Sequence, residues 1–133
     1  MSGASTKVAL DHLVDTDVWI DFLRRYAQAI RFIRALPDRV FISAVSVAEL
    51  HVGMRGGAER QALDELLSTL EVLEINATIA AKGGLLKRDY RRSHGVGLNG
   101  ALIAATAQED GLKLCTLDVK HYRLLGKEQL KRA

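Results

Sequence analysis

The sequence is poor in the residues that mark several protein classes. Its 133 residues include one proline and one cysteine, Cys115, which excludes an internal disulfide and a zinc site built on paired cysteines. It contains neither the glycine-rich dinucleotide-binding motif nor the P-loop motif. No apolar run approaches the ~18 residues of a membrane-spanning helix, and residues 1–10 lack the apolar stretch of a signal peptide. We therefore expect a cytoplasmic protein that has no membrane partner.

The remaining composition is that of an ordinary globular domain. Hydrophobic residues make up 48% of the chain and charged residues 26%, which excludes collagen, a coiled coil and wholesale disorder. The formal net charge of +3 is compatible with a polyanionic partner without requiring one. A chain of this length can bury a core of its own. We expect a single domain over residues 1–133, in which residues 1–10 form a flexible N-terminal extension.

Short apolar runs alternate with longer stretches of helical periodicity. Strands separated by helices favour right-handed crossovers, and so an α/β fold with a parallel sheet covered on both faces. Residues 99–110 are almost entirely apolar in the middle, which predicts a helix buried nearly all round, and Gly111 is expected to end it. The expected strands cover residues 11–15, 39–43, 71–75 and 113–116, and the expected helices cover residues 17–36, 44–54, 59–70, 77–93 and 99–110.

Acidic residues stand near the carboxyl ends of these strands, where parallel sheets bind their ligands. Asp15 ends the first strand, Glu49 lies in the helix after the second, and Asp118 follows the fourth. Carboxylates from separate segments suit a hard cation such as Mg²⁺ or Mn²⁺. Each also has a purely structural interpretation. Asp17 and Asp118 occupy N-cap-like positions, and Ser46 with Glu49 matches a capping box.

Two surface features admit both a functional and a structural interpretation. Arg88, Arg91 and Arg92 share one helical face, which is either a track for an RNA backbone or a solvated stripe. The aromatic side chains of Trp19, Phe22 and Tyr26 either form an exposed groove for a partner segment or belong to the core. In the first case Arg24 and Arg25 beside them would pair with acidic residues of that partner.

Three segments of the chain resemble a known family when read in order. They are LVDTDVWIDFL from residue 13, FISAVSVAELHVGM from residue 41, and LNGALIAATAQEDGLKLCTLDVKHY from residue 98. Together they are similar to the PIN-domain family and, more narrowly, to the VapC-type toxins of bacterial toxin–antitoxin pairs. The resemblance runs from Leu13 to Tyr122, which is most of the chain.

This resemblance implies a fold, an activity and partners. The fold is a three-layer α/β/α sandwich with a mostly parallel sheet of four to five strands. The activity is a Mg²⁺- or Mn²⁺-dependent endoribonuclease that a VapB-type antitoxin neutralises, in a homodimer or a toxin–antitoxin hetero-oligomer. By position, Asp15, Glu49 and Asp118 match the catalytic and metal-binding acids of the family. The polar residues expected beside them are Thr16, Ser43, Asn99 and Thr116.

The chain departs from the family pattern at one position. Family members typically carry an aspartate directly before the segment ALIAATA, and Gly100 stands there in this sequence. Asn99, the expected N-cap of that helix, offers a neutral oxygen beside it. Loss of one acid is expected to impair the metal site, whether the change is natural or was selected because the active enzyme poisons its host. The alternatives are a non-catalytic PIN-fold module that binds antitoxin or RNA, and a phosphoacceptor receiver domain built on Asp15.

Overall fold

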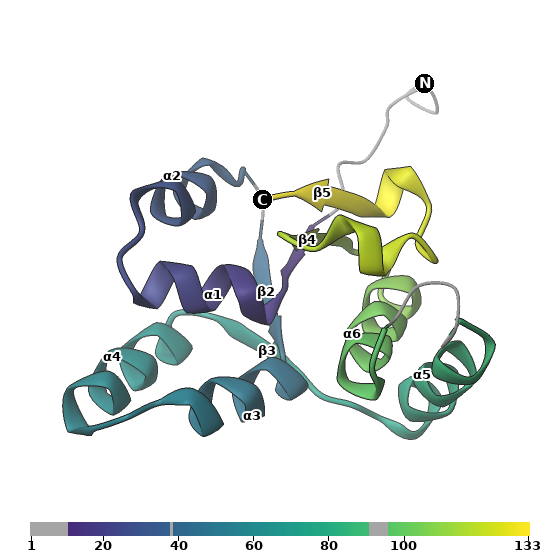
Figure 1. Ribbon diagram of the computed structural model, residues 1–133, viewed down its shortest axis with the longest axis horizontal. Coiled ribbons are helices and arrows are strands. Elements are labelled where there is room, and N and C mark those ends of the chain that lie inside the picture. Colours follow the sequence, from purple (N-terminus) through teal and green to yellow (C-terminus); the bar gives the residue numbers. More distant parts are fainter. Residues whose placement is uncertain (1–10, 38, 91–95) are drawn as a thin grey trace, which may run out of the picture.

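The computed structural model describes residues 11–37, 39–90 and 96–133, and it contains a central sheet of five parallel strands (Figure 1). The strand order is β3-β2-β1-β4-β5, so β1 lies in the middle, with His12 opposite both Val40 and Lys113. The predicted parallel sheet is therefore confirmed, and the strand at the C-terminal end is one that the apolar runs did not indicate. The strands are β1 (His12–Val14), β2 (Val40–Ser43), β3 (Glu71–Leu73), β4 (Lys113–Thr116) and β5 (Leu130–Arg132).

Helices cover both faces of this sheet, as the α/β/α expectation requires. Figure 1 shows α1 to α4 on one side of the strands and α5 and α6 on the other. None of the helices in the described ranges is long and apolar enough to cross a membrane. The helices are α1 (Thr16–Leu23), α2 (Ala27–Ala35), α3 (Ala44–Gly53), α4 (Gly57–Ser68), α5 (Ala77–Tyr90) and α6 (Leu98–Glu109), and short 3₁₀ helices cover Val119–Tyr122 and Lys127–Gln129.

The three inner strands send alternate side chains to two separate cores. Leu13 of β1 packs with the α6 residues Ile103 and Ala104, whereas the next residue, Val14, packs with Trp19 and Leu50 on the other face. This alternation follows from the period of two in a β-strand. The strands are therefore held from both sides, which fixes their register and the positions of the residues that follow their carboxyl ends.

The expected single helix over residues 17–36 is wrong, because the chain reverses in the middle of it. Helix α1 ends at Leu23 and α2 begins at Ala27, and Arg25 between them has a φ of 63°. That left-handed conformation ends the run of helical hydrogen bonds, so α2 folds back and packs against α1. Apolar residues continue at helical spacing across the break, so periodicity alone does not reveal it.

Two expected helix starts are one residue late, at α1 and α6, and the α3 start at Ala44 is as expected but has a different cap from the one that Ser46 and Glu49 suggest. Asp15, and not Asp17, caps α1 and accepts a hydrogen bond from the Thr16 N–H at 2.8 Å. Ser43 caps α3 through the Val45 N–H at 3.0 Å, so the expected capping box of Ser46 and Glu49 does not form. The cap of α6 is Gly97, which puts Asn99 inside the first turn. Each helix therefore begins almost directly at a strand end or loop.

Helix α6 is buried nearly all round, as its composition predicts. Residues 101 and 103–107 are all buried, and Gly111 ends the helix with a φ of 64°. Helix α5 packs closely along α6, and Gly83 of α5 lies directly against Leu102 of α6. A β-carbon at Gly83 would lie 2.6 Å from Leu102 Cδ2 and 3.1 Å from Leu102 Cα, whereas one at the neighbouring Gly84 would meet nothing within 4 Å.

These two adjacent glycines give a matched test of the α5–α6 contact. We expect Gly84→Ala to raise the free energy of unfolding by ~0.5–1 kcal/mol, because alanine favours a helix interior and has room there. We expect Gly83→Ala to lower it by ~1–3 kcal/mol, because the new methyl group overlaps Leu102. Urea unfolding followed by circular dichroism measures both changes. An equal gain in both variants would show that the helices are not packed this closely.

Candidate functional site

Polar residues gather where β1, β2 and β4 end, at one edge of the sheet. Asp15, Ser43 and Thr116 each end or directly follow one of these strands, and all three are buried. The Asp15 N–H donates to the Cys115 carbonyl at 2.9 Å, which continues the pairing of β1 with β4 to the last residue. This edge is the one where the sequence predicts the chemistry. Ser43 lies there as the cap of α3.

The Asp15 carboxylate accepts hydrogen bonds from three parts of the chain. Its Oδ1 accepts from the Thr16 N–H and its Oδ2 from the Thr116 hydroxyl, both at 2.8 Å, and the Tyr122 hydroxyl is a third partner. Burial raises the pKa of Asp15 above its ordinary value, the nearby Glu49 adds to this, and the three donors oppose it. Asp15 is therefore a buried carboxylate whose orientation is set by its surroundings.

Glu49 reaches the same edge from α3 and is linked to Asp15 through Thr16. The Thr16 hydroxyl lies 2.7 Å from Glu49 Oε1 and 2.7 Å from the Ser46 hydroxyl. A hydroxyl has one proton, and an ionised carboxylate only accepts, so Thr16 donates to Glu49 and accepts from Ser46. The Asn99 amide donates to Glu49 Oε2 at 3.5 Å from the start of α6. The structure thus brings together the predicted Asp15, Thr16, Glu49 and Asn99.

Asp17 is the acidic residue that sequence reasoning assigned only to a helix cap. Its Oδ2 lies 3.3 Å from the Thr116 hydroxyl and accepts from the Leu117 N–H at 3.2 Å, while its Oδ1 is buried and has no hydrogen-bond partner among the described residues. Burial, followed by the charge of Asp15, raises the pKa of Asp17 to about 7. The signal in the sequence is the Asp-Thr-Asp run at the end of β1, which places both carboxylates at one strand end.

Asp118 belongs to the cluster through its backbone, while its side chain turns elsewhere. Its N–H donates to the Thr116 hydroxyl at 3.0 Å, and Thr116 in turn donates to Asp15. The Asp118 carboxylate pairs with His121 Nδ1 one turn later, and both side chains are about half exposed. Thr116 therefore joins Asp15, Asp17 and the main chain of Asp118, so its predicted supporting place is beside all three.

Position 100 lies in the first turn of α6, as expected, and the space beside it is already filled. A β-carbon on Gly100 would lie 2.8 Å from Val96 Cγ2 and 3.1 Å from the Tyr122 hydroxyl oxygen. Tyr122 is buried and comes from the 3₁₀ helix that follows Asp118. The space where a side chain at position 100 would point is therefore occupied by Val96 and by the hydroxyl of Tyr122, neither of which the sequence analysis singles out.

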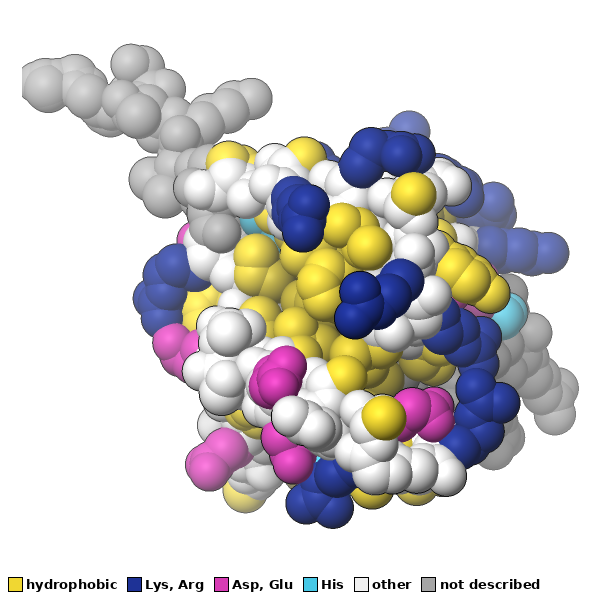
Figure 2. Space-filling model, turned by 90° about the vertical axis from the view of Figure 1, so that its left-hand side faces the viewer, with side chains coloured by type: hydrophobic (Ala, Val, Ile, Leu, Met, Phe, Trp, Pro, Cys, Tyr) yellow, Lys and Arg dark blue, Asp and Glu magenta, His cyan; other side chains and the backbone are white. Residues whose placement is uncertain are grey.

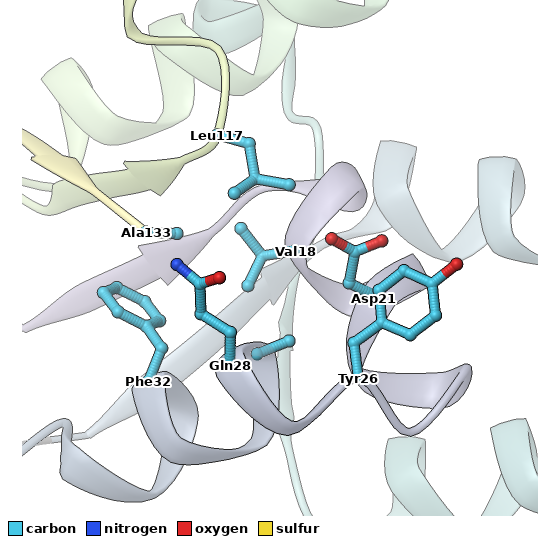
Figure 3. Close-up of a pocket in the computed structure, with 8 residues that line it drawn as sticks. Val18, Asp21, Tyr26, Gln28, Phe32, Leu117 and Ala133 are labelled. Atoms are coloured by element: carbon cyan, nitrogen blue, oxygen red, sulfur yellow. The ribbon is translucent and has the colours of Figure 1, made fainter.

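The predicted aromatic groove does not exist in the expected form. Trp19 has no exposed surface and belongs to the core, where Phe22 packs edge-on against it with ring centroids 5.7 Å apart. Tyr26 is 53% exposed, but it lines a separate cavity of about 120 Å³ with Asp21 and Leu117, shown in Figure 3. Two aromatic residues of the proposed three thus pack inward, because they face the sheet from α1.

An apolar groove of about 360 Å³ does lie next to these aromatic residues, between α1, α3 and α4. Figure 2 shows this side of the molecule, where apolar side chains gather in the middle of the face, with Lys and Arg side chains around them and Asp and Glu side chains along the lower part. Glu49 of the carboxylate cluster lies at its wall. The apolar lining consists of Ile20, Leu23, Leu50, Met54, Ala58, Ala62 and Leu63, and the charged lining consists of Arg24, Arg25, Arg55, Glu49 and Glu59.

The predicted basic track is described only in part. Arg88 is exposed on α5 and pairs with Asp89, with 3.0 Å between Nε and Oδ1. Arg91 and Arg92 lie outside the described residues. The RNA-binding role of these three residues therefore stays a prediction.

The carboxylate cluster has the donor set for a hard divalent cation. In the described ranges, no three His, Cys, Asp or Glu side chains are already arranged around a common metal position. However, the buried Asp17 Oδ1 has no hydrogen-bond partner in the part of the chain that the structure describes, and burial, followed by the charge of Asp15, raises the pKa of Asp17. An unsatisfied carboxylate oxygen beside a second buried carboxylate is relieved by a cation with oxygen preference. The residues present therefore fit such a cation.

Comparison with known proteins identifies the family. The PIN domain model matches residues 12–126. The chain is 44% identical to "Ribonuclease VapC10" of Mycobacterium tuberculosis over 122 residues, which is 90% of each protein. Solved structures with the same fold include a toxin–antitoxin complex from Klebsiella pneumoniae (TM-score 0.78, 27% identity, 91% of this chain and 96% of that one). VapBC-5 from Mycobacterium tuberculosis is also similar (TM-score 0.66, 27% identity, 92% and 97%). The chain therefore belongs to the PIN domain family, among its VapC members.

Proposed function

We propose that this protein is a metal-dependent endoribonuclease toxin of the VapC type, which hydrolyses RNA phosphodiester bonds and is neutralised by a VapB-type antitoxin. The observation that carries the proposal is the convergence of Asp15, Asp17 and Glu49 at one sheet edge, joined through Thr16 and Thr116. The 44% identity to a protein named as a ribonuclease, over 90% of both chains, supports the same activity. The non-catalytic PIN module is the outcome that an absence of RNA cleavage would favour.

The cation in this proposal is Mg²⁺ or Mn²⁺, held by Asp15, Asp17 and Glu49. When bound, such an ion would lower the pKa of a coordinated water and offset the negative charge that develops on the phosphate. Asp118 stays the predicted fourth ligand. Its carboxylate is about half exposed and pairs with a half-exposed histidine, and such surface contacts are weak.

The protein's own residues orient the carboxylates before any ligand arrives. The Thr116 hydroxyl has one proton, and its 2.8 Å contact with Asp15 is shorter than its 3.3 Å contact with Asp17. Thr116 therefore donates its hydrogen bond to Asp15, while Asp17 accepts a hydrogen bond from the Leu117 N–H. Within the described residues this leaves the buried Oδ1 of Asp17 without a hydrogen-bond partner, so it is the oxygen that we expect a cation to bind.

The antitoxin in this proposal occupies the groove between α1, α3 and α4. The groove offers an apolar floor for an amphipathic segment, and Arg24, Arg25 and Arg55 offer pairs for acidic residues of that segment. Glu49 lies both in the groove wall and in the carboxylate cluster. A segment that fills the groove therefore reaches the cluster, which provides a direct route to inhibition. A homodimer or a toxin–antitoxin hetero-oligomer is the expected assembly.

RNA cleavage and metal-dependent stabilisation test the proposed activity together. We expect the chain to cut RNA only with Mg²⁺ or Mn²⁺ present, and these ions to raise its melting temperature, because they bind the folded state alone. We expect Asp15→Asn to remove both effects. Cleavage of a labelled RNA and a thermal melt with and without the ion measure them.

Asp64→Asn is the control for this experiment, because Asp64 is an exposed carboxylate on α4 that pairs with Arg60. It is expected to keep both the cleavage and the metal response. Cleavage that persists in the presence of a chelator, or that Asp15→Asn leaves intact, would contradict the proposed site.

Asp17 is expected to make cation binding depend on pH. Its pKa is about 7 in the folded chain, against an ordinary value of 3.8. Without a cation, its contribution to stability is therefore full below ~pH 4 and is lost as the pH rises to ~7. A proton then competes with the cation, so Mn²⁺ affinity should rise from ~pH 5.5 to ~pH 7 and level off above.

Isothermal titration calorimetry with Mn²⁺ measures this dependence. At ~pH 6, buffers of different ionisation enthalpy should reveal nearly one proton released per bound ion, and at ~pH 8 almost none. In Asp17→Asn the proton release should be smaller and the affinity profile flatter. Equal proton release in Asp17→Asn and the parent chain would place the titrating group elsewhere.

Charge reversal at the groove tests the antitoxin proposal. We expect Arg24→Glu to weaken binding of the co-expressed VapB-type antitoxin at least tenfold, about 1.4 kcal/mol, because it places a negative charge before acidic partner residues. Arg34→Glu on α2 is the matched control, since Arg34 is exposed and does not line the groove. Biolayer interferometry measures both affinities. Equal losses in the two variants would indicate a general charge effect and not this groove.

A further inference from the structure

We infer that Tyr122 is a positioning residue of the carboxylate cluster: its hydroxyl takes the place left by the missing side chain at position 100 and donates a hydrogen bond to Asp15. The inference rests on the proposed function for the role of Asp15 as a cation ligand. The packing of Tyr122 against Gly100 stands independently of that role. The two residues lie on different elements, α6 and the 3₁₀ helix after β4.

The first step is the space around Gly100. A β-carbon there would lie 3.1 Å from the Tyr122 hydroxyl oxygen and 3.6 Å from the ring carbon that carries it. It would also lie 2.8 Å from Val96 Cγ2, which is closer than real β-carbons come to a neighbour. Any side chain at position 100 therefore has to displace the phenol or the valine. Tyr122 fits because residue 100 is a glycine.

The second step is the direction of the phenol. The Tyr122 ring is buried in the core on the α6 face of the sheet, together with Leu13 and Val96. Its hydroxyl lies at the border of this core, where it meets Asp15. The ring is thus fixed by packing and the hydroxyl is aimed at a carboxylate. A group held in this way restricts the orientation of its partner.

The third step is the charge state of the phenol. A phenol is neutral near neutral pH, because its ordinary pKa is about 10. The hydroxyl therefore keeps its proton and serves as a donor to Asp15. A carboxylate at position 100 would instead add a fourth negative charge. The cluster of this chain thus combines three carboxylates with a neutral donor.

A double-mutant cycle with Mn²⁺ alone tests the inference, using Tyr122→Phe, Gly100→Asp and the double variant. We expect Tyr122→Phe to lower Mn²⁺ affinity about tenfold, because partners that orient metal ligands have effects of this size. We expect Gly100→Asp alone to lower the melting temperature, since the new side chain overlaps Tyr122 and Val96. In the Tyr122→Phe background it should cost less stability and raise Mn²⁺ affinity at least tenfold.

The contact with Val96 is present in both backgrounds, so its contribution cancels in the cycle. Tyr26→Phe is the control for loss of a phenol hydroxyl, because Tyr26 is exposed and lies in a different cavity, and it should leave Mn²⁺ affinity unchanged. A merely structural Tyr122 would change stability but not Mn²⁺ affinity. Mn²⁺ affinity within twofold of the parent in Tyr122→Phe, or additive effects of the two substitutions on stability, would overturn the inference.

The cycle also separates this inference from the proposed function. If the parent chain binds Mn²⁺ but cuts no RNA, the endoribonuclease proposal fails. The double-mutant cycle then still tests the positioning role of Tyr122. If the parent chain binds no Mn²⁺, both the cation site and the positioning role of Tyr122 fail. The stability measurements then still show whether the phenol occupies the space beside Gly100.

Discussion

The buried Asp15 carboxylate is the interaction on which both the fold and the site depend. It caps α1 through the Thr16 N–H and binds the hydroxyl of Thr116 at the end of β4. One side chain thereby fixes where a helix starts, how two neighbouring strands end, and where a negative charge lies. A buried carboxylate is costly unless it is well bonded, and the donors around Asp15 offset part of that cost. Burial, and then the same charge, raise the pKa of Asp17, so the arrangement that orders the strand ends also favours a cation there.

The carboxylate cluster at this edge of the sheet lowers the stability of the fold and at the same time favours the binding of a cation. Three carboxylates in one region repel one another, and over the described ranges one buried oxygen of Asp17 has no hydrogen-bond partner. Hydroxyls from three elements reduce the repulsion: Thr16 on α1, Thr116 on β4 and Tyr122 on the following 3₁₀ helix. Because each hydroxyl is neutral, it orients a carboxylate without cancelling the charge that attracts a cation. The two cores on either face of the sheet stabilise the fold and so offset the destabilisation that the carboxylate cluster causes.

The layered architecture of this fold can be predicted from the sequence more completely than the geometry of its site. Alternating apolar runs and helical stretches predict the parallel sheet, and strand ends direct attention to Asp15 and Glu49. The break at Arg25 is not visible in this way, because apolar spacing continues through a chain reversal that depends on one left-handed residue. The caps at Asp15 and Ser43 were missed because each of these residues ends or directly follows a strand and also begins a helix. Asp17 was assigned to a cap for the same reason, since spacing along the chain does not show which way a carboxylate turns.

Position 100 shows why a departure from a family pattern is hard to judge along the chain alone. In the sequence, Gly100 replaces an acidic residue. The neighbouring residue that could offer a side-chain oxygen in its place is Asn99. In the structure, Asn99 donates to Glu49, while the space beside Gly100 is taken by Tyr122 from another element. The glycine lets the tyrosine lie this close, because a β-carbon at position 100 would press on the Tyr122 hydroxyl at 3.1 Å and on Val96 Cγ2 at 2.8 Å. Gly100 and Tyr122 therefore have to be considered together. They lie on different elements, and only the folded chain brings them into contact.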